Sequence, residues 1–593
     1  MPTNALKMDA TNPADNSANK KTNLTLVHNS DFDGDAFEGF FAPVSSDFVD
    51  TLIELYSADK QRITEMARYM ESIETNTALK YFIEGNLWDE KYGTPRKLEN
   101  LFSLEGAIGQ LNATFWSRAF GLTDVYDYMP QSRRDEWNEQ MRYPLGRKAS
   151  STTKEIHPLP EFAAETARTT LQDLLHSRAK FFAERIDNLF KGLSRSHVTN
   201  QPEGFSKRMI INHAISNGFV DYSTAGLVND LRCVIAKFMG RDEPKWDATS
   251  QVFDFVRQRN GEWRAIDGGA LRMRIYNGVG TVHLEVNPEI AYRLNAILAS
   301  LYPRAIPHKF RKKPVRTKRI KEFELFDKPL PFTVISCLAA MEQDFDIIKD
   351  GYRTSRKYIE NSLRALRSHD LDKATRKATE DVLRAIGGVF DGKRWMFDYD
   401  TKSVIGEIIC NGSIPDEQSH QFFPTPEELA TEVVRIANVG AEPGMRWLEP
   451  HAGIGGLADH VPSDAYLLCN EISELHCKIL EAKGYDTQES SLRTVKNMDF
   501  LVLAKEYAGK PFDRIVANPP FSEQRWQRHI EAAVPLLAEN GRLVAILPAS
   551  ASNKVLVEGY EHTYSPVFKN RFTGASVSVV IVTIEKKNRG DHA

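Results

Sequence analysis

The sequence is poor in cysteine, and its cysteines are not spaced for a metal site or a redox pair. Only five occur in 593 residues, and no two of them form a CxxC pair. A sparse, odd-numbered set in a long chain is typical of a reducing compartment and argues against a disulfide scaffold. Cys469, His476 and Cys477 are close in sequence, but no fourth ligand follows at zinc spacing. We therefore expect these cysteines to be small buried side chains and expect no bound metal.

Long apolar runs are also absent. The chain opens with MPTNALKMDATNPADNSANKKTN, which is polar and lacks the apolar core of a signal peptide. No later segment is long and apolar enough to span a bilayer. These absences predict a cytoplasmic protein without a membrane partner.

An overall excess of positive charge is absent as well. The formal net charge is −4, so an anionic partner must be met by local basic patches. The length suggests about three or four domains, and changes in composition and periodicity along the chain indicate where they divide.

The first part of the chain changes from a polar tail to a helical region. Residues 1–45 are rich in Asn, Asp, Ala and Thr, and we expect a disordered tail there. The string DFDGDAFEGFFA, from Asp31, resembles a calcium loop at its first, third and fifth positions, but Ala36 and Ala42 replace the turn glycine and the closing glutamate. Calcium is therefore not expected. Over 46–200, Leu, Ile and Phe recur at helical spacing and predict packed helices.

Residues 201–303 have a mixed texture that predicts an α+β domain. The strings LRMRIY and TVHLEV flank NGVG and predict a β-hairpin with one apolar face. The other face carries Arg272 and Arg274, which we assign to DNA contact. The region is thus a candidate for DNA recognition.

The densest basic run follows, in a segment taken as residues 304–328. Between Arg304 and Lys321 there is no acidic residue. A phosphate-backbone contact and a solvated linker both fit such a run, and the sequence does not separate them. The candidate phosphate contacts are Arg311, Lys312, Lys313, Arg316, Lys318 and Arg319.

Two further segments complete the chain. Residues 329–410 are expected to form a helical connector, in which Arg353, Arg356 and Lys357 recur at loosely helical spacing. From 411 to 593, strand-like runs such as MRWLEP, AYLLCNE, FDRIVANPP and GRLVAILP alternate with helical ones. That alternation predicts an α/β domain built on a parallel sheet.

A glycine-rich turn and an acid mark a nucleotide-type pocket in this last domain. In WLEPHAGIGGLADH, a strand and Glu449 precede Gly453 and Gly455, where bare backbone allows close approach of a ligand. No Gly-Lys-Ser/Thr follows, so the turn is not a P-loop. Glu471 ends the next strand, about twenty residues on, where an acid hydrogen-bonds ribose hydroxyls.

The string NPPF follows the strand FDRIVA, at the sheet edge where α/β ligand sites form. Pro519 and Pro520 make a rigid turn and remove two backbone donors. The Asn518 side-chain oxygen and the Pro519 carbonyl remain as acceptors for the two hydrogens of an amino group. The ring of Phe521 suits a flat base held in the pocket.

Together these strings resemble the class I methyltransferases, and specifically the amino-group DNA methyltransferases. The resemblance covers residues from about 421 to 586, with the motif order of the gamma group. It implies a Rossmann-like C-terminal domain that binds S-adenosyl-L-methionine. It assigns FFPTPEELA to the methionine end of the cofactor and Asp499-Phe500 to its adenine. The implied cofactor-binding residues are Phe423, Thr425, Pro426, Glu449, Gly453, Gly455, Glu471, Asp499 and Phe500.

Two features depart from that family. His451 stands where a small residue is commoner, and the chain ends soon after the catalytic sheet, where the gamma group usually carries target recognition. Recognition is therefore expected before residue 420. The arrangement resembles phage- and plasmid-borne methyltransferases with an N-terminal domain of unknown function, which implies a solitary enzyme protecting DNA from restriction in a bacterial cell, or in the host cell if a phage encodes it.

The resemblance leads to a specific hypothesis: adenine-N6 methylation of double-stranded DNA on a flipped base, with Asn518, Pro519, Pro520 and Phe521 as catalytic residues. Several alternatives stay open. An RNA guanine-N2 or adenine methyltransferase shares NPPF, although Ser522 stands where the guanine-N2 enzymes usually have His. A protein-glutamine methyltransferase, a cytosine-N4 methyltransferase and an inactive DNA-binding or anti-restriction protein of this fold are the others. The sequence does not predict the oligomeric state.

Overall fold

The structure is a computed structural model, and two compact units divide its chain. It describes residues 46–71, 103–149, 154–194, 197, 199–216, 218–302, 305–311, 329–350, 353–366, 371–414, 424–488, 491–572 and 577–587. Of these, 244–270 and everything from 329 onward belong to one unit, which we call the catalytic unit because it holds the residues predicted to be catalytic. The rest belong to a second unit. The tail expected over 1–45 lies outside the described residues. Among the helices of the described part, none is long and apolar enough to cross a membrane.

The second unit begins with helices that pack around aromatic side chains. The rings of Phe115 and Trp116 are fully buried and meet Phe162 at centroid distances of 5.7 and 4.9 Å. Tyr56 adds its ring and donates its hydroxyl to the Asn112 carbonyl oxygen over 2.8 Å. The described part of 46–200 contains helices α1 (Ser46–Glu71), α4 (Leu104–Gly121), α5 (Val125–Tyr128), α6 (Gln131–Arg142), α7 (Ala164–His176) and α8 (Arg178–Gly192).

The hairpin predicted from LRMRIY and TVHLEV is present in the same unit. Strand β5 (Leu271–Tyr276) pairs antiparallel with β6 (Thr281–Val286), which also pairs with β1 (Arg208–Ile211). Along β5, buried side chains alternate with partly exposed ones, as the period of a half-buried strand requires. Helices α9 (Tyr222–Phe238) and α11 (Pro288–Leu301) complete the unit's regular structure, together with a short hairpin, β2 (Ile215–Ser216) and β3 (Phe219–Val220), and one helical turn, α12 (His308–Arg311).

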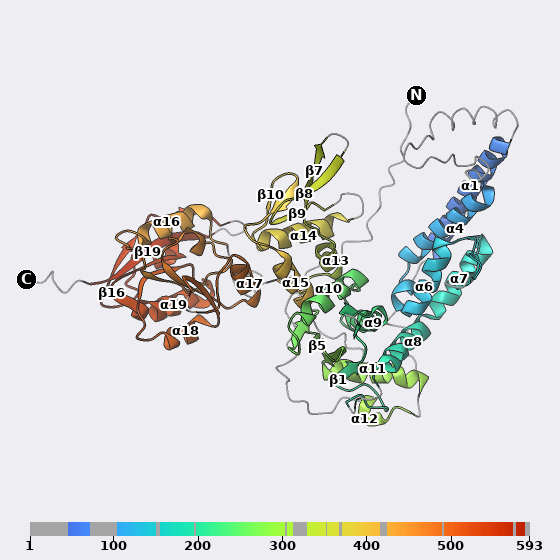
Figure 1. The fold of residues 1–593 in the computed structure, drawn as a ribbon, viewed down its shortest axis with the longest axis horizontal. Coiled ribbons are helices and arrows are strands. Elements are labelled where there is room, and N and C mark those ends of the chain that lie inside the picture. Colours follow the sequence, from blue (N-terminus) through green and yellow to red (C-terminus); the bar gives the residue numbers. More distant parts are fainter. Residues whose placement is uncertain are drawn as a thin grey trace, which may run out of the picture. The chain divides into compact units, whose positions relative to one another are not determined.

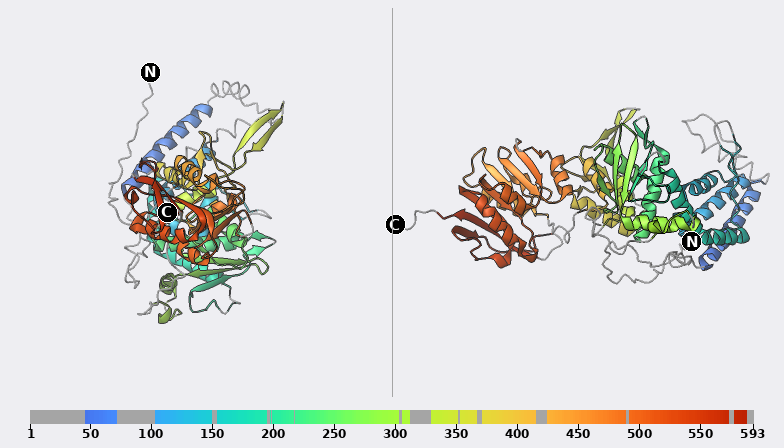
Figure 2. Two further views of the ribbon diagram at one scale, coloured as in Figure 1. Left: turned by 90° about the vertical axis from the view of Figure 1, so that its left-hand side faces the viewer. Right: turned by 90° about the horizontal axis from the view of Figure 1, so that it is seen from below.

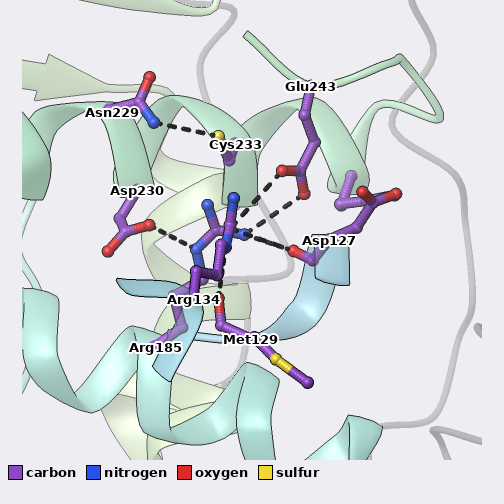
Figure 3. Close-up of polar contacts among 9 residues, drawn as sticks. Asp127, Met129, Arg134, Arg185, Asn229, Asp230, Cys233 and Glu243 are labelled. Atoms are coloured by element: carbon purple, nitrogen blue, oxygen red, sulfur yellow. Dashed lines mark hydrogen bonds and ion pairs between the residues drawn. The ribbon is translucent and has the colours of Figure 1, made fainter. Parts of the chain in front are cut away.

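A buried ionic cluster joins α8 and α9 (Figure 3). The fully buried Arg185 donates its Nε–H to Asp230 over 2.7 Å and pairs with Glu243 at 3.3 Å. Burial opposes the charge on this guanidinium, but the two carboxylates together raise the pKa of Arg185 above its ordinary value. Glu243 also pairs with Arg134 at 3.7 Å, so each carboxylate in the cluster faces a guanidinium. Removing one partner would leave a buried charge uncompensated.

In the catalytic unit, the prediction of a helical connector over 329–410 is wrong. Antiparallel strands separate its helices, and Arg353, Arg356 and Lys357 lie on one of these strands. The missed signal is Gly351, a residue type typical of hairpin turns, which stands between two runs that contain Ile, Tyr and Thr. The elements are α13 (Phe332–Ala339), β7 (Phe345–Asp350), β8 (Arg353–Tyr358), β9 (Ser362–Arg364), α14 (Lys373–Ala385), β10 (Val389–Phe390), β11 (Arg394–Met396) and α15 (Lys402–Asn411), with α10 (Trp246–Arg257) and β4 (Arg264–Ile266) from the earlier segment.

The last part of the chain forms the predicted parallel sheet (Figure 1). The strands run in the order β14-β13-β12-β15-β16-β19-β17, and all adjacent pairs from β14 to β16 are parallel. Strand β19 is antiparallel to both of its neighbours. The strand bounds are β12 Arg446–Glu449, β13 Tyr466–Glu471, β14 Arg493–Asn497, β15 Phe512–Ala517, β16 Leu537–Pro548, β17 Tyr560–Tyr564, β18 Phe568–Lys569 and β19 Ser578–Lys586.

Helices cover both faces of this sheet because successive residues of each strand point to opposite sides. On β12, Trp447 belongs to the apolar core shared with α16 (Glu427–Ala437) and α17 (Glu474–Ala482). The adjacent Leu448 belongs to the opposite core, under α18 (Phe500–Glu506) and α19 (Arg525–Ala533). A sheet buried on both faces leaves its strand ends as the place where a ligand can approach.

Candidate active site

A cavity of about 540 Å³ lies at the carboxyl edge of the parallel sheet. Its volume is in the range of small-molecule and cofactor sites. The ends of β12, β13, β14 and β15 supply its wall. Among the residues predicted from the sequence, it brings together Thr425, Gly453, Glu471, Asp499, Phe500, Asn518, Pro519, Pro520 and Phe521.

The glycine turn after β12 provides the floor of the cavity. Gly453 and Gly455 have φ values of 54° and 99°, a backbone conformation that favours glycine. Gly456 is needed for another reason: a Cβ there would lie 3.3 Å from Cβ of Thr425. The turn thus keeps backbone exposed to a ligand and lets the segment before α16 approach closely.

Glu471 is fixed in its charged form at the end of β13. Its Oε2 accepts from the Gly453 N–H and its Oε1 from the Ser473 N–H, both over 2.8 Å. Burial would raise the pKa of Glu471, but His476 and these two backbone donors hold it below its ordinary value. A carboxylate held in this way can accept hydrogen bonds from a pair of ribose hydroxyls.

An apolar residue that the sequence analysis missed stands next to this acid. Ile472 lines the cavity, although its side chain is 59% exposed. An exposed aliphatic side chain beside a ribose-binding acid is placed to pack on the flat face of an adenine. Its signal in the sequence is weak, since one apolar residue after a strand has no distinctive pattern.

Asp499 and Phe500 follow β14. Asp499 is the N-cap of α18, and its Oδ1 accepts from the Leu501 N–H over 2.7 Å. Phe500 is almost fully buried, and both residues line the cavity. The capping bond fixes the carboxyl group, so the acid and ring are held together at the adenine side of the site.

The catalytic turn follows β15, and its asparagine is oriented by a neighbour. The Asn518 side-chain nitrogen donates to the Thr425 hydroxyl over 3.1 Å. That bond uses an N–H of the amide and leaves the side-chain oxygen as an acceptor facing the cavity. Phe521 lies beside it, half-buried between the two cores of the sheet. The turn therefore presents acceptors and an aromatic ring together.

Some predicted cofactor residues do not line the cavity. Gly455 and Pro426 lie outside its wall, and Phe423 lies outside the described residues. Glu449 is buried beneath the turn, where burial and the nearby Asp459 and Glu471 raise its pKa well above the ordinary value. Glu449 therefore lies beneath the turn and is not part of the cavity wall.

His451, the unusual residue of the glycine motif, pairs with a histidine of α19. Its Nε2 lies 2.6 Å from Nδ1 of His529, and the two rings are nearly parallel. Burial and the neighbouring ring lower the pKa of His451 well below its ordinary value, and burial also lowers the pKa of His529. The pair is thus neutral and shares one proton. It links the glycine turn to the helix behind the catalytic turn.

Helix α19 contributes further residues that the sequence analysis missed. Arg525, Arg528 and His529 line the cavity beside the catalytic turn. They recur at helical spacing in RWQRH, so one face of α19 points to the site. Two arginines in the wall of this cavity are suitably charged to bind an anionic group such as a phosphate.

The residues assigned to DNA contact are only partly visible. Arg272 pairs with the buried Glu285 at 3.3 Å, and the guanidinium of Arg274 lies 5.0 Å from the ring centre of Tyr276. Both guanidinium groups therefore have partners within the protein. The side chain of Arg311 and residues Lys312, Lys313, Arg316, Lys318 and Arg319 lie outside the described part.

A second cavity in the catalytic unit, of about 610 Å³, lies among α10, α13 and α15. Polar side chains in its wall are used internally: Gln251 donates to the Ala339 carbonyl, and Gln343 to the Ile359 carbonyl over 2.8 Å. The described residues of its wall include neither a glycine-rich turn nor a set of acceptors like that at Asn518. Among the described residues, no group of three or more His, Cys, Asp or Glu side chains is arranged to hold a metal ion.

The strand order decides the fold. Counted along the chain from β12, the parallel strands β14, β13, β12, β15 and β16 have the order 3-2-1-4-5. The antiparallel strand β19 lies between β16 and β17. This is the arrangement of the class I methyltransferases. The C-terminal domain has the class I methyltransferase fold. S-adenosyl-L-methionine is the cofactor of this fold. Glu471 at the end of β13 fits its ribose, and Asp499 and Phe500 at the start of α18 fit its adenine. The bare glycine turn allows its close approach.

Comparison with known proteins gives the following matches. Residues 108–304 match a family described as "Domain of unknown function (DUF4942)", and no curated protein matches. TrmN from Thermus thermophilus is 23% identical, with a TM-score of 0.23, over 27% of this chain and 49% of TrmN. This chain thus spans about half the length of TrmN.

Two further solved structures are more fully covered. A putative RNA methyltransferase from Pyrococcus horikoshii is 17% identical, with a TM-score of 0.23, over 30% of this chain and 92% of that protein. A putative class I S-adenosylmethionine-dependent methyltransferase from Listeria monocytogenes is 11% identical, with a TM-score of 0.24, over 32% of this chain and 66% of that protein. Substrate and partners are therefore argued from the site of this chain itself.

Proposed function

We propose that the protein is a DNA adenine-N6 methyltransferase that uses S-adenosyl-L-methionine. The observation that carries the proposal is the bond from the Asn518 amide to Thr425, which leaves two acceptors, the Asn518 oxygen and the Pro519 carbonyl, at the cavity. An exocyclic amino group offers two hydrogens to such a pair. Both acceptors suit a neutral amine, which is the nucleophile in the reaction.

The chain's residues act mainly by positioning. The cofactor supplies an electrophilic methyl group on its sulfonium. Asn518 and Pro519 hold the amino hydrogens, so the nitrogen lone pair is aimed at that methyl group, and Phe521 packs on the base. Orientation of this kind can supply several kcal/mol of the barrier reduction. The nitrogen would bond the methyl carbon as the bond from that carbon to the sulfonium breaks, and the amino group would then lose one proton to water at the pocket mouth.

Two features favour DNA as the partner. The target base must leave a duplex to reach a cavity enclosed by the sheet edge and α19, and Phe521 offers a ring for the extruded base. Arg525 and Arg528 bring positive charge to the mouth of the same cavity. The sequence also holds the basic segment 304–328, in a chain whose net charge is −4. A solitary phage- or plasmid-type enzyme that protects DNA from restriction is consistent with this partner.

The test offers the protein three kinds of methyl acceptor in parallel reactions. The full-length protein and labelled cofactor are incubated with unmethylated duplex DNA, with total RNA or with a protein extract. We expect label in the DNA sample. Label confined to RNA or protein would assign the fold to a different substrate, and an absence of label in all three, with cofactor bound, would favour an inactive DNA-binding protein.

A further inference from the structure

Strands β7 and β8 form a two-stranded ribbon with exposed side chains on both faces. Its paired residues run from Phe345 opposite Tyr358 to Asp350 opposite Arg353. Ile347 and Ile348 point to opposite faces, yet their side chains are 64% and 45% exposed. In Figures 1 and 2 the ribbon extends beyond the other elements of its own unit, and these two strands form a sheet by themselves.

A ribbon of this kind is only marginally stable alone, so its base must be held. The ring of Phe345 packs against Tyr358 at a centroid distance of 5.7 Å, and the guanidinium groups of Arg356 and Arg364 lie 4.6 and 4.8 Å from the Phe345 ring centre. Asp346 accepts from Arg394 of β11 over 2.6 Å. These contacts are confined to the base and anchor the ribbon to the body of the catalytic unit.

Charge is distributed unevenly along the ribbon. The acids at its base are engaged: Asp346 bonds Lys393 and Arg394, which lower the pKa of Asp346 to about 2, and Asp344 pairs with Arg394 at 3.2 Å. From Ile347 to Lys357, by contrast, the sequence holds four basic residues and one acidic residue. Strand β8, RTSRKY, has three basic residues and no acid. The projecting part is therefore cationic.

We propose that the β7–β8 ribbon binds in the major groove of the DNA substrate. A six-residue strand is about 20 Å long, and the major groove, about 12 Å wide, admits a two-stranded ribbon. Arg356, which is exposed although its guanidinium lies over the Phe345 ring, and the exposed Lys357 contact phosphates at the groove edges. Ile347, opposite Arg356, offers an apolar surface to thymine methyl groups. The inference rests on the proposed function, because it takes DNA as the substrate.

The ribbon also accounts for where target recognition can occur. The ribbon belongs to the same compact unit as the cavity. An element of the catalytic unit that recognises the DNA sequence does not depend on the placement of the second unit. Recognition would then be divided between groove contacts by the ribbon and the pocket that accepts the flipped base.

The experiment measures DNA affinity against salt for the full-length protein, with a fluorescent 40-base-pair duplex of mixed sequence. The test variant is Arg356→Gln/Lys357→Gln. The matched control is Lys505→Gln/Lys510→Gln, which removes two exposed cations near the end of α18, at the amino edge of the sheet and away from the cavity. A conservative variant, Arg356→Lys/Lys357→Arg, keeps the charge.

We expect the log-log salt slope of the test variant to be flatter by about 1.8, or about 0.9 for each phosphate that the protein no longer neutralises. The control and conservative variants should keep the wild-type slope, and all variants should bind cofactor equally. Parallel lines for the test variant and wild type would overturn the inference. So would a change in oligomeric state with unchanged DNA affinity, because the ribbon edges would then pair with a second copy of the chain.

The proposed function can fail separately. If the wild type binds DNA with a ribbon-dependent slope but transfers no methyl group to it, adenine methylation is wrong and the ribbon inference stands. If the wild type methylates DNA and the test variant binds DNA as the wild type does, only the ribbon inference is wrong. Replacing Ile347 by Ser adds a further readout, since it should change the preference among duplex sequences while leaving the salt slope unchanged.

Discussion

The side-chain nitrogen of Asn518 donates to the hydroxyl of Thr425 over 3.1 Å, and this bond decides which atom of the amide faces the cavity. The two residues are 93 positions apart, and Gly456 leaves the room that Thr425 needs. A segment before the sheet thereby orients the catalytic turn after β15. Thr425, assigned from the sequence to the cofactor, lines the cavity and also bonds Asn518, so we propose that it positions the catalytic turn as well.

The first prediction separates these two roles. Asn518→Ala removes an acceptor used mainly in the transition state, so kcat should fall by about a hundredfold or more. Thr425→Val keeps the shape and loses the orienting bond, so kcat should fall by a smaller factor. Cofactor affinity should stay near wild type for Asn518→Ala. Wild-type turnover by that variant would refute the role of the turn.

The cofactor acids provide the second prediction. Glu471→Ala and Asp499→Ala each leave a donor of the cofactor without its acceptor, at a cost of roughly 1–3 kcal/mol. Titration calorimetry should show S-adenosyl-L-methionine binding weakened by about five- to 150-fold. Glu449→Gln is the comparison, because that side chain lies beneath the turn and should change affinity little. Unchanged affinity in both alanine variants would mean that the pocket is misplaced.

The histidine pair predicts a pH dependence. The folded pKa of His451 lies well below its unfolded value near 6.5, so below pH 6.5 the unfolded chain binds more protons than the folded one. The contribution of His451 to the free energy of unfolding should therefore be fully present at pH 7.5 and be lost as the pH drops below about 6.5. His529, also lowered, and His283, lowered to about 4, act in the same direction.

The check is denaturant unfolding of wild type and His451→Ser at several pH values. The relevant transition is the one that S-adenosyl-L-methionine shifts, since a ligand stabilises the unit that binds it. The variant should lose less stability than wild type between pH 7.5 and pH 5. Equal losses would show that the His451–His529 pair does not titrate as described.

The buried ionic cluster predicts the stability of the second unit. Asp230→Asn leaves Arg185 with a buried, incompletely compensated charge, so the free energy of unfolding should fall by about 3–5 kcal/mol. The matched control is Asp50→Asn, which breaks an exposed pair with Arg168 at 2.7 Å and should cost less than about 1 kcal/mol. Similar costs in urea unfolding of the two variants would contradict the structural role of the cluster.

The basic segment predicts a separate effect on DNA binding. If Arg311, Lys312, Lys313, Lys318 and Arg319 contact phosphates, neutralising all five should flatten the log-log salt slope by about 4.5 and weaken binding to all duplexes alike. If the segment is a solvated linker, its variant and the wild type should give coincident lines. Cofactor affinity, measured in parallel, shows that the variant is folded.

The parts of the site that were predictable from sequence are those encoded by short, local strings. The glycine turn, Glu471, Asp499-Phe500 and the NPPF turn all meet at one cavity because carboxyl ends of parallel strands share an edge. The hairpin of β5 and β6 was predictable for the same reason, since alternation and a turn pair are local. Gly351 was an equally local signal, but the basic residues after it were read at helical spacing.

The parts that were not predictable depend on tertiary contacts. His529 faces His451 across 78 positions, and no spacing rule relates α19 to the glycine turn. Glu449 matches the family motif, but its burial beneath the turn follows only from how β12 meets the segment at Asp459. The partners of Arg272 and Arg274 likewise come from the neighbouring strand and ring, and only the structure shows them. Their assignment to DNA contact stays a prediction.

The measurement that tests the central claim most directly identifies the modified nucleoside. Unmethylated duplex DNA is incubated with S-adenosyl-L-methionine and either wild type or Asn518→Ala, then digested to nucleosides and analysed by mass spectrometry. We predict N6-methyldeoxyadenosine with the wild type and at least about a hundredfold less with the variant in the same time. A methylated cytosine in place of adenine, or equal yields from both proteins, would contradict the account.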